Sequence, residues 1–123
     1  MTKISVTEEE LRTIDNYLKG YRLNEKLLKL DKYERTYFGY TDNGEYPACD
    51  SAFCRAKMFE IRHFIMDIKN GDEKLMLYYH YIRGESVERC AELLGISRSS
   101  GFRLKKRALE LAAKSFKKEE PPT

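Results

Sequence analysis

Apolar residues recur three and four positions apart through most of the chain, and this spacing constrains the fold more than any other feature of the sequence. It is the period of one face of an α-helix, whereas the strict alternation of a β-strand is scarce. The clearest stripe consists of Leu11, Ile14, Leu18 and Tyr21. Thr7-Glu8-Glu9-Glu10 precedes it as a capping box, which predicts a helix from about residue 8 to about residue 34. The sequence therefore predicts an all-α protein of about five helices.

Turn and cap residues mark the boundaries of the other helices. Gly39, Asp42-Asn43-Gly44 and Pro47 predict an exposed, mobile loop over about 36–50. A second helix should begin at Asp50 or Ser51 and end at Asn70-Gly71. The remaining boundaries follow from caps and glycines: Asp72 opens and Gly84 ends the third helix, Ser86 and Gly95 bound the fourth, and Ser97 opens the fifth, which should reach Lys114 or beyond.

The apolar faces of these helices predict the core. In the second helix the expected face consists of Phe53, Met58, Ile61, Ile65 and Ile68. In the third, Leu75, Leu77, Tyr78, Tyr81 and Ile82 cover much of the circumference, so this helix should be central to the fold. We expect residues 1–71 to form a helical N-terminal region, residues 72–118 a second region, and residues 119–123 a frayed tail.

Positive charge is concentrated at the C-terminal end of the chain. The 123 residues hold 23 Lys and Arg against 20 Asp and Glu, a net charge of +3. Residues 97–123 alone hold 8 basic and 3 acidic residues, so this end carries +5 and the rest carries −2. Such a distribution indicates a polyanionic partner. No apolar stretch of the sequence approaches the roughly 18–20 residues that a membrane span requires. We also expect no secretory signal, because residues 1–13 have no apolar run behind Lys3.

Residues 86–109, SVERCAELLGISRSSGFRLKKRAL, have the pattern of a helix-turn-helix. Ala91 is small where a second helix must pass close, and Gly95 lies where the chain needs a positive φ to turn. Ile96 should pack beneath the turn, and Ser97 should cap the second helix. Val87, Leu94, Leu104 and Ala108 should form the core that the two helices share.

The second helix of this motif has the side chains for reading a DNA major groove. Arginine can grip guanine O6 and N7, serine can bond to base edges or phosphates, and phenylalanine can touch a thymine methyl group. The exposed positions should be Arg98, Ser99, Phe102, Arg103 and Lys106, with Lys105 and Arg107 on phosphates. Ser86 should receive a phosphate at the start of the preceding helix, and Ser97 completes the expected contact set. About five phosphate contacts would give a slope of about −4 to −5 in log K against log salt.

The segment YHYIRGESVERCAELLGISRSSGFRLKKRALEL resembles the C-terminal helix-turn-helix of bacterial sigma factors, the part that reads the upstream promoter element. The matching residues are Gly84-x-Ser86, Ala91, Leu94-Gly95-Ile96-Ser97 and Arg107-Ala108-Leu109. The chain departs from that pattern at Gly101, where sigma factors usually have Val or Ile. The whole layout resembles the RinA/ArpU-type late transcriptional regulators of phages and mobile elements.

That resemblance implies a non-enzymatic DNA-binding regulator in the cytoplasm of a bacterial host. Its partners would be double-stranded DNA and bacterial RNA polymerase, and its action that of an activator. Two alternatives stay open. One is a small terminase-type phage packaging subunit. The other is a sigma-like module that contacts polymerase without binding DNA itself. The stripe from Leu11 to Leu28 favours packing within the chain over a homodimer seam, but is compatible with both.

Other residue groups have simpler interpretations than a catalytic or metal site. Cys49 and Cys54 with His63 and His80 lack the usual zinc spacing, so we expect no metal and no cofactor. His80 should be a packed or hydrogen-bonded histidine, and Cys90 a small core residue. Tyr33, Tyr37, Tyr40 and Tyr46 favour core or interface packing over base stacking.

Overall fold

Five α-helices and one π-helix make up the computed structural model, which describes residues 6–38, 50–69 and 71–119. They are α1 (Glu8–Phe38), α2 (Ser51–Asp67), α3 (Asp72–Leu77), η1 (Tyr78–Ile82), α4 (Val87–Leu94) and α5 (Arg98–Glu119). No strand occurs in these ranges, so the predicted all-α class is confirmed. Most of the expected loop, Tyr40, Tyr46, Cys49, Asn70 and residues 120–123 lie outside the described residues.

Side-chain caps begin α1 and α2 at the predicted positions. Thr7 and Glu10 form the capping box: the Thr7 N–H donates to Glu10 Oε1 at 2.9 Å, and the Glu10 N–H donates to Thr7 Oγ1 at 3.1 Å. Asp50 caps α2 by accepting from the Ala52 and Phe53 N–H groups. Two predicted ends were wrong. Helix α1 runs to Phe38 rather than about residue 34, and α2 ends at Asp67 rather than at Asn70-Gly71. Helix α5 continues to Glu119, which agrees with the expected end at Lys114 or beyond and adds the first residue of the expected tail to the helix.

The predicted third helix is divided into α3 and η1. At its end the Arg83 N–H donates to the Tyr78 carbonyl five residues earlier, at 3.1 Å, which is the spacing of a π-helix. Gly84 then turns the chain with φ +74°. A Cβ at Gly84 would lie 2.7 Å from the Arg22 guanidinium carbon, so this turn packs directly on α1.

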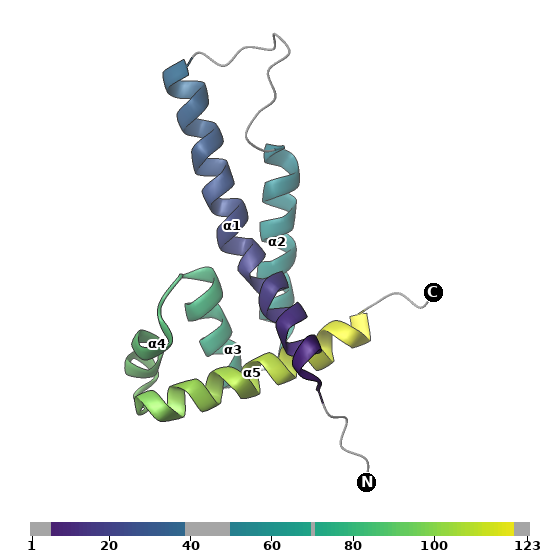
Figure 1. The fold of residues 1–123 in the computed structure, drawn as a ribbon, viewed down its shortest axis with the longest axis vertical. Helices are drawn as coiled ribbons and strands as arrows, with labels where there is room; N and C mark the ends of the chain where they lie inside the picture. Colours follow the sequence, from purple (N-terminus) through teal and green to yellow (C-terminus); the bar gives the residue numbers. More distant parts are fainter. Residues whose placement is uncertain (1–5, 39–49, 70, 120–123) are drawn as a thin grey trace.

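The helices α1 and α2 form an antiparallel hairpin that rises from a base made by α3, η1, α4 and α5 (Figure 1). One hydrophobic core joins the lower part of the hairpin to this base, and it includes side chains from both expected regions of the chain. Its largest fully buried members are Ile14, Leu18, Ile61, Ile65, Met76, Leu77 and Leu104. The division into residues 1–71 and 72–118 stays a prediction.

The predicted core faces were mostly right, with two exceptions. Ile14, Leu18 and Tyr21 are buried, which confirms packing within the chain for the first half of the Leu11–Leu28 stripe. Leu75 and Phe53 were expected in the core but are exposed. Both are apolar residues on helices whose buried side is set by neighbouring helices, and Met76 and Cys54, beside them in the chain, are buried instead.

A buried hydrogen bond ties α1 to η1. The Tyr81 hydroxyl donates to the Asp15 carboxylate, and Lys19 forms an ion pair with the same carboxylate at 2.9 Å. Burial acts to raise the pKa of Asp15, but the bonds from Tyr81 and Lys19 outweigh it and hold that pKa below its ordinary value. Burial and the neighbouring Asp15 raise the pKa of Tyr81, so Tyr81 remains a hydrogen-bond donor.

His80 is packed and hydrogen-bonded, as the sequence predicted. Its Nδ1 lies 2.7 Å from the Glu85 carbonyl oxygen, which can only accept, so Nδ1 carries the proton. Burial lowers the pKa of His80, and the positive charge of Lys105 adds to this, while the bond to Glu85 opposes it. The folded protein therefore holds His80 in its neutral form.

This environment predicts a pH dependence of stability. Because the pKa of His80 is lower in the folded state than the ordinary value of about 6.5, the unfolded chain binds more protons once the pH falls through that value. The midpoint of thermal unfolding should fall as the pH is lowered from about 6.5 toward the lowered pKa of His80, because the unfolded chain takes up the proton first.

The His80→Gln variant should show a weaker fall over this range, because it removes the group that takes up the proton. His63→Gln is the matched control for the substitution itself, since it removes the other histidine of the chain, whose side chain is exposed on α2. Circular dichroism melts over a pH series measure both. Equal pH dependence in the wild type and His80→Gln would contradict the assignment.

Candidate nucleic-acid interface

The segment α4–turn–α5 has the local geometry of a helix-turn-helix. Ser86 caps α4 by accepting from the Arg89 N–H at 3.1 Å, and Ser97 caps α5 by accepting from the Ser100 N–H at 3.1 Å. Gly95 has φ +71°, and the Gly95 and Ile96 N–H groups donate to the carbonyls of Glu92 and Ala91. This pair of bonds is a Schellman motif, which ends a helix and redirects the chain sharply. The predicted boundaries of both helices are confirmed.

Gly101 allows the two helices to approach closely. It is buried, and a Cβ built on it would lie 2.9 Å from the Ala91 Cβ and 3.6 Å from Val87 Cγ1. Real Cβ atoms essentially never lie this close, so a side chain at this position would push α5 away from α4. The predicted small residue at Ala91 thus meets a second small residue on α5. The contact fixes the rotation of α5 about its axis, with Leu104 and Ala108 also turned into the core.

The opposite side of α5 is exposed and basic. Ser99, Phe102, Arg103 and Lys106 all lie on it, as the sequence predicted, and the Phe102 side chain is 46% exposed. We call these four residues the outer face of α5. Arg98 lies next to this face at the first turn, with its guanidinium 5.8 Å from the centre of the Phe102 ring. Figure 1 shows α5 along the edge of the fold that lies farthest from the hairpin tip.

Lys105 and Arg107 lie on opposite flanks of α5, because two residues are separated by about 200° around a helix. Lys105 is half-buried on the flank toward η1, where its charge acts on His80 and Asp15. Arg107 is exposed on the other flank, and its Nε lies 3.8 Å from a carboxylate oxygen of Glu73 on α3. The structure therefore separates these two cations by the width of the helix.

Several predicted contact residues also have partners within the chain. Arg98 forms an ion pair with Glu88 of α4 at 3.3 Å, and Arg103 donates to the Ser100 hydroxyl at 3.2 Å. The hydroxyls of Ser86 and Ser97 are engaged as helix caps. No local sequence pattern predicts the ion pairs of Arg98 and Arg107, because their acidic partners lie on other helices.

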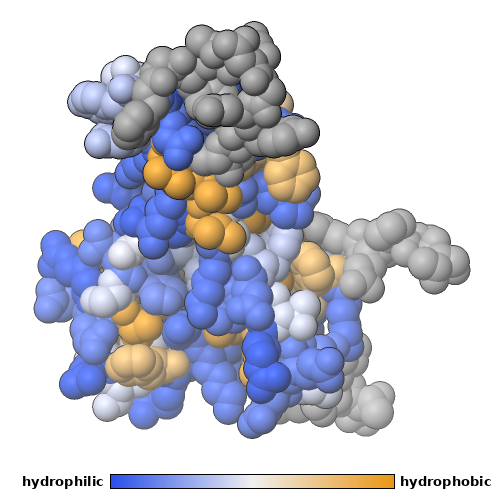
Figure 2. Space-filling view, turned by 45° about the horizontal axis from the view of Figure 1, so that its top comes forward, coloured by the Kyte–Doolittle hydropathy of each residue, from blue (hydrophilic) through white to orange (hydrophobic). Residues whose placement is uncertain are grey.

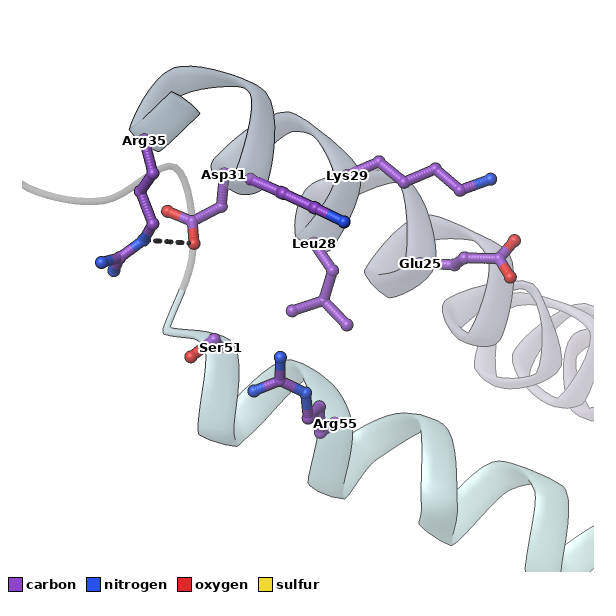
Figure 3. Close-up of a pocket in the computed structure, with 8 residues that line it drawn as sticks. Glu25, Leu28, Lys29, Asp31, Arg35, Ser51 and Arg55 are labelled. Atoms are coloured by element: carbon purple, nitrogen blue, oxygen red, sulfur yellow. Dashed lines mark hydrogen bonds and ion pairs between the residues drawn. The ribbon is translucent and has the colours of Figure 1, made fainter. Parts of the chain in front are cut away.

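A cleft at the other end of the molecule lies between the last turns of α1 and the start of α2. It has a volume of about 350 Å³. Leu28 and Arg55 point into it, while Arg35 donates to the buried Asp31 at its edge at 2.9 Å (Figure 3). The described lining contains charges of both signs but no histidine or cysteine: Glu25, Leu28, Lys29, Asp31, Lys32, Arg35, Ser51 and Arg55. The cleft therefore presents charged groups of both signs that can form ion pairs.

Two properties of the described residues bear on alternative functions. Over the described ranges, no group of three or more histidine, cysteine or acidic side chains is arranged to hold a metal ion. None of the described helices combines the length and apolar character needed to cross a membrane. Comparisons with protein-family models, curated proteins and solved structures find no match for this chain.

Proposed function

We propose that this protein is a sequence-specific DNA-binding transcriptional regulator, and an activator of phage or mobile-element genes. The observation that carries the proposal is the exposed basic outer face of α5, held at the second position of a helix-turn-helix. In such motifs the N-terminal residues of the second helix contact base edges in the major groove, while the first helix crosses the backbone. Nothing in the described part of the chain covers the outer face of α5.

The exposed side chains of α5 have two roles, one for the outer face and one for the flanks. Arg103 and Lys106 can donate to guanine O6 and N7, and Ser99 can bond to a base edge or a phosphate. Phe102 offers an apolar surface for a thymine methyl group. Because Lys105 and Arg107 lie on opposite flanks, each can reach the phosphates of a different strand when α5 enters the groove. The contacts to base edges select the DNA sequence, and the contacts to phosphates add affinity.

The test is a binding-site selection from random double-stranded DNA, followed by affinity measurements on the selected site. Arg103→Ala should weaken binding to that site by about 1–3 kcal/mol and relax the preference at one base pair. Arg107→Ala should weaken binding to all sequences alike and reduce the slope of log K against log salt by about 1. Arg62→Ala is the matched control, because it removes an exposed arginine from α2, far from α5 in sequence and on the hairpin.

Equal, salt-insensitive binding by the wild type and Arg103→Ala would contradict the proposal. If no DNA is bound even at low salt, while purified bacterial RNA polymerase is retained, the chain acts as a sigma-like module that contacts polymerase alone. A large ring in sedimentation would favour the terminase-type packaging role instead.

A further inference from the structure

The second half of α1 carries an apolar stripe on the side that faces away from the core. Leu23, Leu30 and Tyr37 follow at intervals of seven residues, and their side chains are 58%, 48% and 68% exposed. With 3.6 residues per turn, these positions lie roughly opposite Ile14 and Leu18, which are buried against the rest of the chain. This surface therefore differs from the Leu11–Leu28 stripe, whose first half is buried in the core.

Two more side chains widen this surface. Leu27 is half-buried on one flank, and Tyr33, 54% exposed, lies on the other with its ring centre 4.6 Å from that of Tyr37. We call Leu23, Leu27, Leu30, Tyr33 and Tyr37 the α1 stripe. Figure 2 shows hydrophobic side chains gathered over the part of the surface that the hairpin forms. If two copies pair through these side chains, they bury together on the order of 1,000 Å² of accessible surface. This is the size at which specific interfaces begin to be stable.

We propose that the α1 stripe is the seam of a parallel homodimer, in which the α1 helices of two copies lie side by side. A seven-residue repeat is the spacing that keeps two supercoiled helices in contact along one seam. In a parallel pair Leu23, Leu30 and Tyr37 occupy the a positions, and each meets its own counterpart. The intervening d positions are Lys26 and Tyr33.

Charge complementarity selects the parallel orientation and a second copy as the partner. Lys29 lies at the g position and Glu34 at the following e position, which pair between chains in a parallel coiled coil. The two-fold axis makes this pair twice. Neither residue is in an ion pair with another described part of the chain. In an antiparallel pair centred on Leu30, g positions face g positions, so Lys29 of one copy would instead lie against Lys29 of the other.

Lys26 sets the strength of the pair. A lysine at one seam position fixes the register of a coiled coil but weakens it. We therefore expect a dimer that dissociates on dilution, and the Lys26→Leu variant should shift the dissociation to lower concentration. The parallel arrangement also places the α4–α5 segments of both copies at the same end of the assembly. The seam lies on α1 and the outer face lies on α5, so dimerisation and DNA binding can each fail without the other.

Sedimentation velocity over a wide concentration range tests the seam. The wild type should form a species of twice the 14.5 kDa chain mass. The Leu23→Glu/Leu30→Glu variant should raise the dissociation constant at least about a hundredfold, because it places charge in the seam. Because Leu23 and Leu30 are exposed in the single chain, the variant should keep the helical content of the wild type, as measured by circular dichroism. Leu75→Glu/Leu93→Glu is the matched control, since it charges two exposed leucines elsewhere and should dimerise normally.

Two further variants test the orientation. Lys29→Glu and Glu34→Lys should each weaken the dimer, and the double exchange should restore it. In a Cys49→Ser background, Leu23→Cys should form a disulfide-linked dimer under mild oxidation, since the two copies of residue 23 face each other only in the parallel pair. Cys49→Ser alone, in which the remaining Cys54 and Cys90 are buried, is the background control.

Some outcomes would overturn the proposal. These are a wild type that stays monomeric at every concentration, normal dimerisation by Leu23→Glu/Leu30→Glu, or no cross-link in a dimeric Leu23→Cys sample. Arg103→Ala should dimerise as the wild type does, which separates a failure of DNA binding from a failure of the seam.

Discussion

Gly101→Val should destabilise the protein by about 1–3 kcal/mol, the usual range for overpacking a filled site. The valine Cβ would lie 2.9 Å from the Ala91 Cβ, and its methyl groups would meet Val87. Neither neighbour is the end of a flexible chain, so α5 must move away from α4. Urea unfolding followed by circular dichroism measures the loss, and DNA affinity should fall with it because the outer face of α5 is turned.

A compensating pair tests the same contact without a large side chain. Alanine favours the helix over glycine by about 1 kcal/mol. Gly101→Ala should nevertheless raise the free energy of unfolding by less than this, because the new Cβ contacts Ala91. In an Ala91→Gly background the contact is absent, and Gly101→Ala should then stabilise by most of that amount. If Gly101→Ala has the same effect in both backgrounds, or Gly101→Val is as stable as the wild type, the close approach of the helices is wrong.

Tyr81→Ala should cause the largest loss of stability, about 3–5 kcal/mol, as expected for removing a buried aromatic side chain. Tyr81 is 2% exposed and its hydroxyl bonds to Asp15, so the change leaves a cavity between α1 and η1 and takes a donor from a partly buried carboxylate. Because one core joins the hairpin to the helices below it, all helices should lose structure in a single transition. Urea unfolding monitored by circular dichroism measures the change.

Tyr81→Phe separates the ring from the hydroxyl. It keeps the buried ring but removes the donor to Asp15, so it should destabilise by about 1–3 kcal/mol. Phe53→Ala is the matched control, because that ring is exposed on α2, outside the proposed seam, and its loss should change the stability little. A loss from Tyr81→Ala no larger than that from Phe53→Ala would contradict the packing described.

The helix starts were predictable from the sequence because capping is a local interaction. Thr7, Asp50, Ser86 and Ser97 each bond to an N–H within three residues, so residue type and position suffice to locate them. The positive φ of Gly95 is equally local. The end of α1 was harder to predict, because a helix end without a strong stop signal depends on how far its residues continue to pack against other helices.

Features that depend on a distant partner were not predictable in the same way. The sequence could not tell that Leu75 faces solvent while Met76 beside it is buried, because that depends on how α3 rests on the other helices. The π-helix at Tyr78–Ile82 has no local signature in the sequence. Gly101 stood out only as a departure from the sigma-factor pattern, and its reason is contact with Ala91, ten residues earlier on another helix.

The candidate site was predictable in its exposure but not in its pairing. The helical period, with Leu104 and Ala108 in the core, places Ser99, Phe102, Arg103 and Lys106 on the outer side. The period does not identify the glutamates that pair with Arg98 and Arg107, because those lie on α4 and α3. These exposed ion pairs are weak, and a phosphate can replace the carboxylate.

The most direct test of the central claim is a methylation-interference experiment on the selected DNA site. Methylation of guanine N7 blocks the major groove at a single base. If the outer face of α5 reads base edges there, methylation at one or more guanines should abolish binding by the wild type, and Arg103→Ala should become insensitive to methylation at one of them. Binding that no methylated guanine affects, or a selection that enriches no sequence at all, would contradict the account.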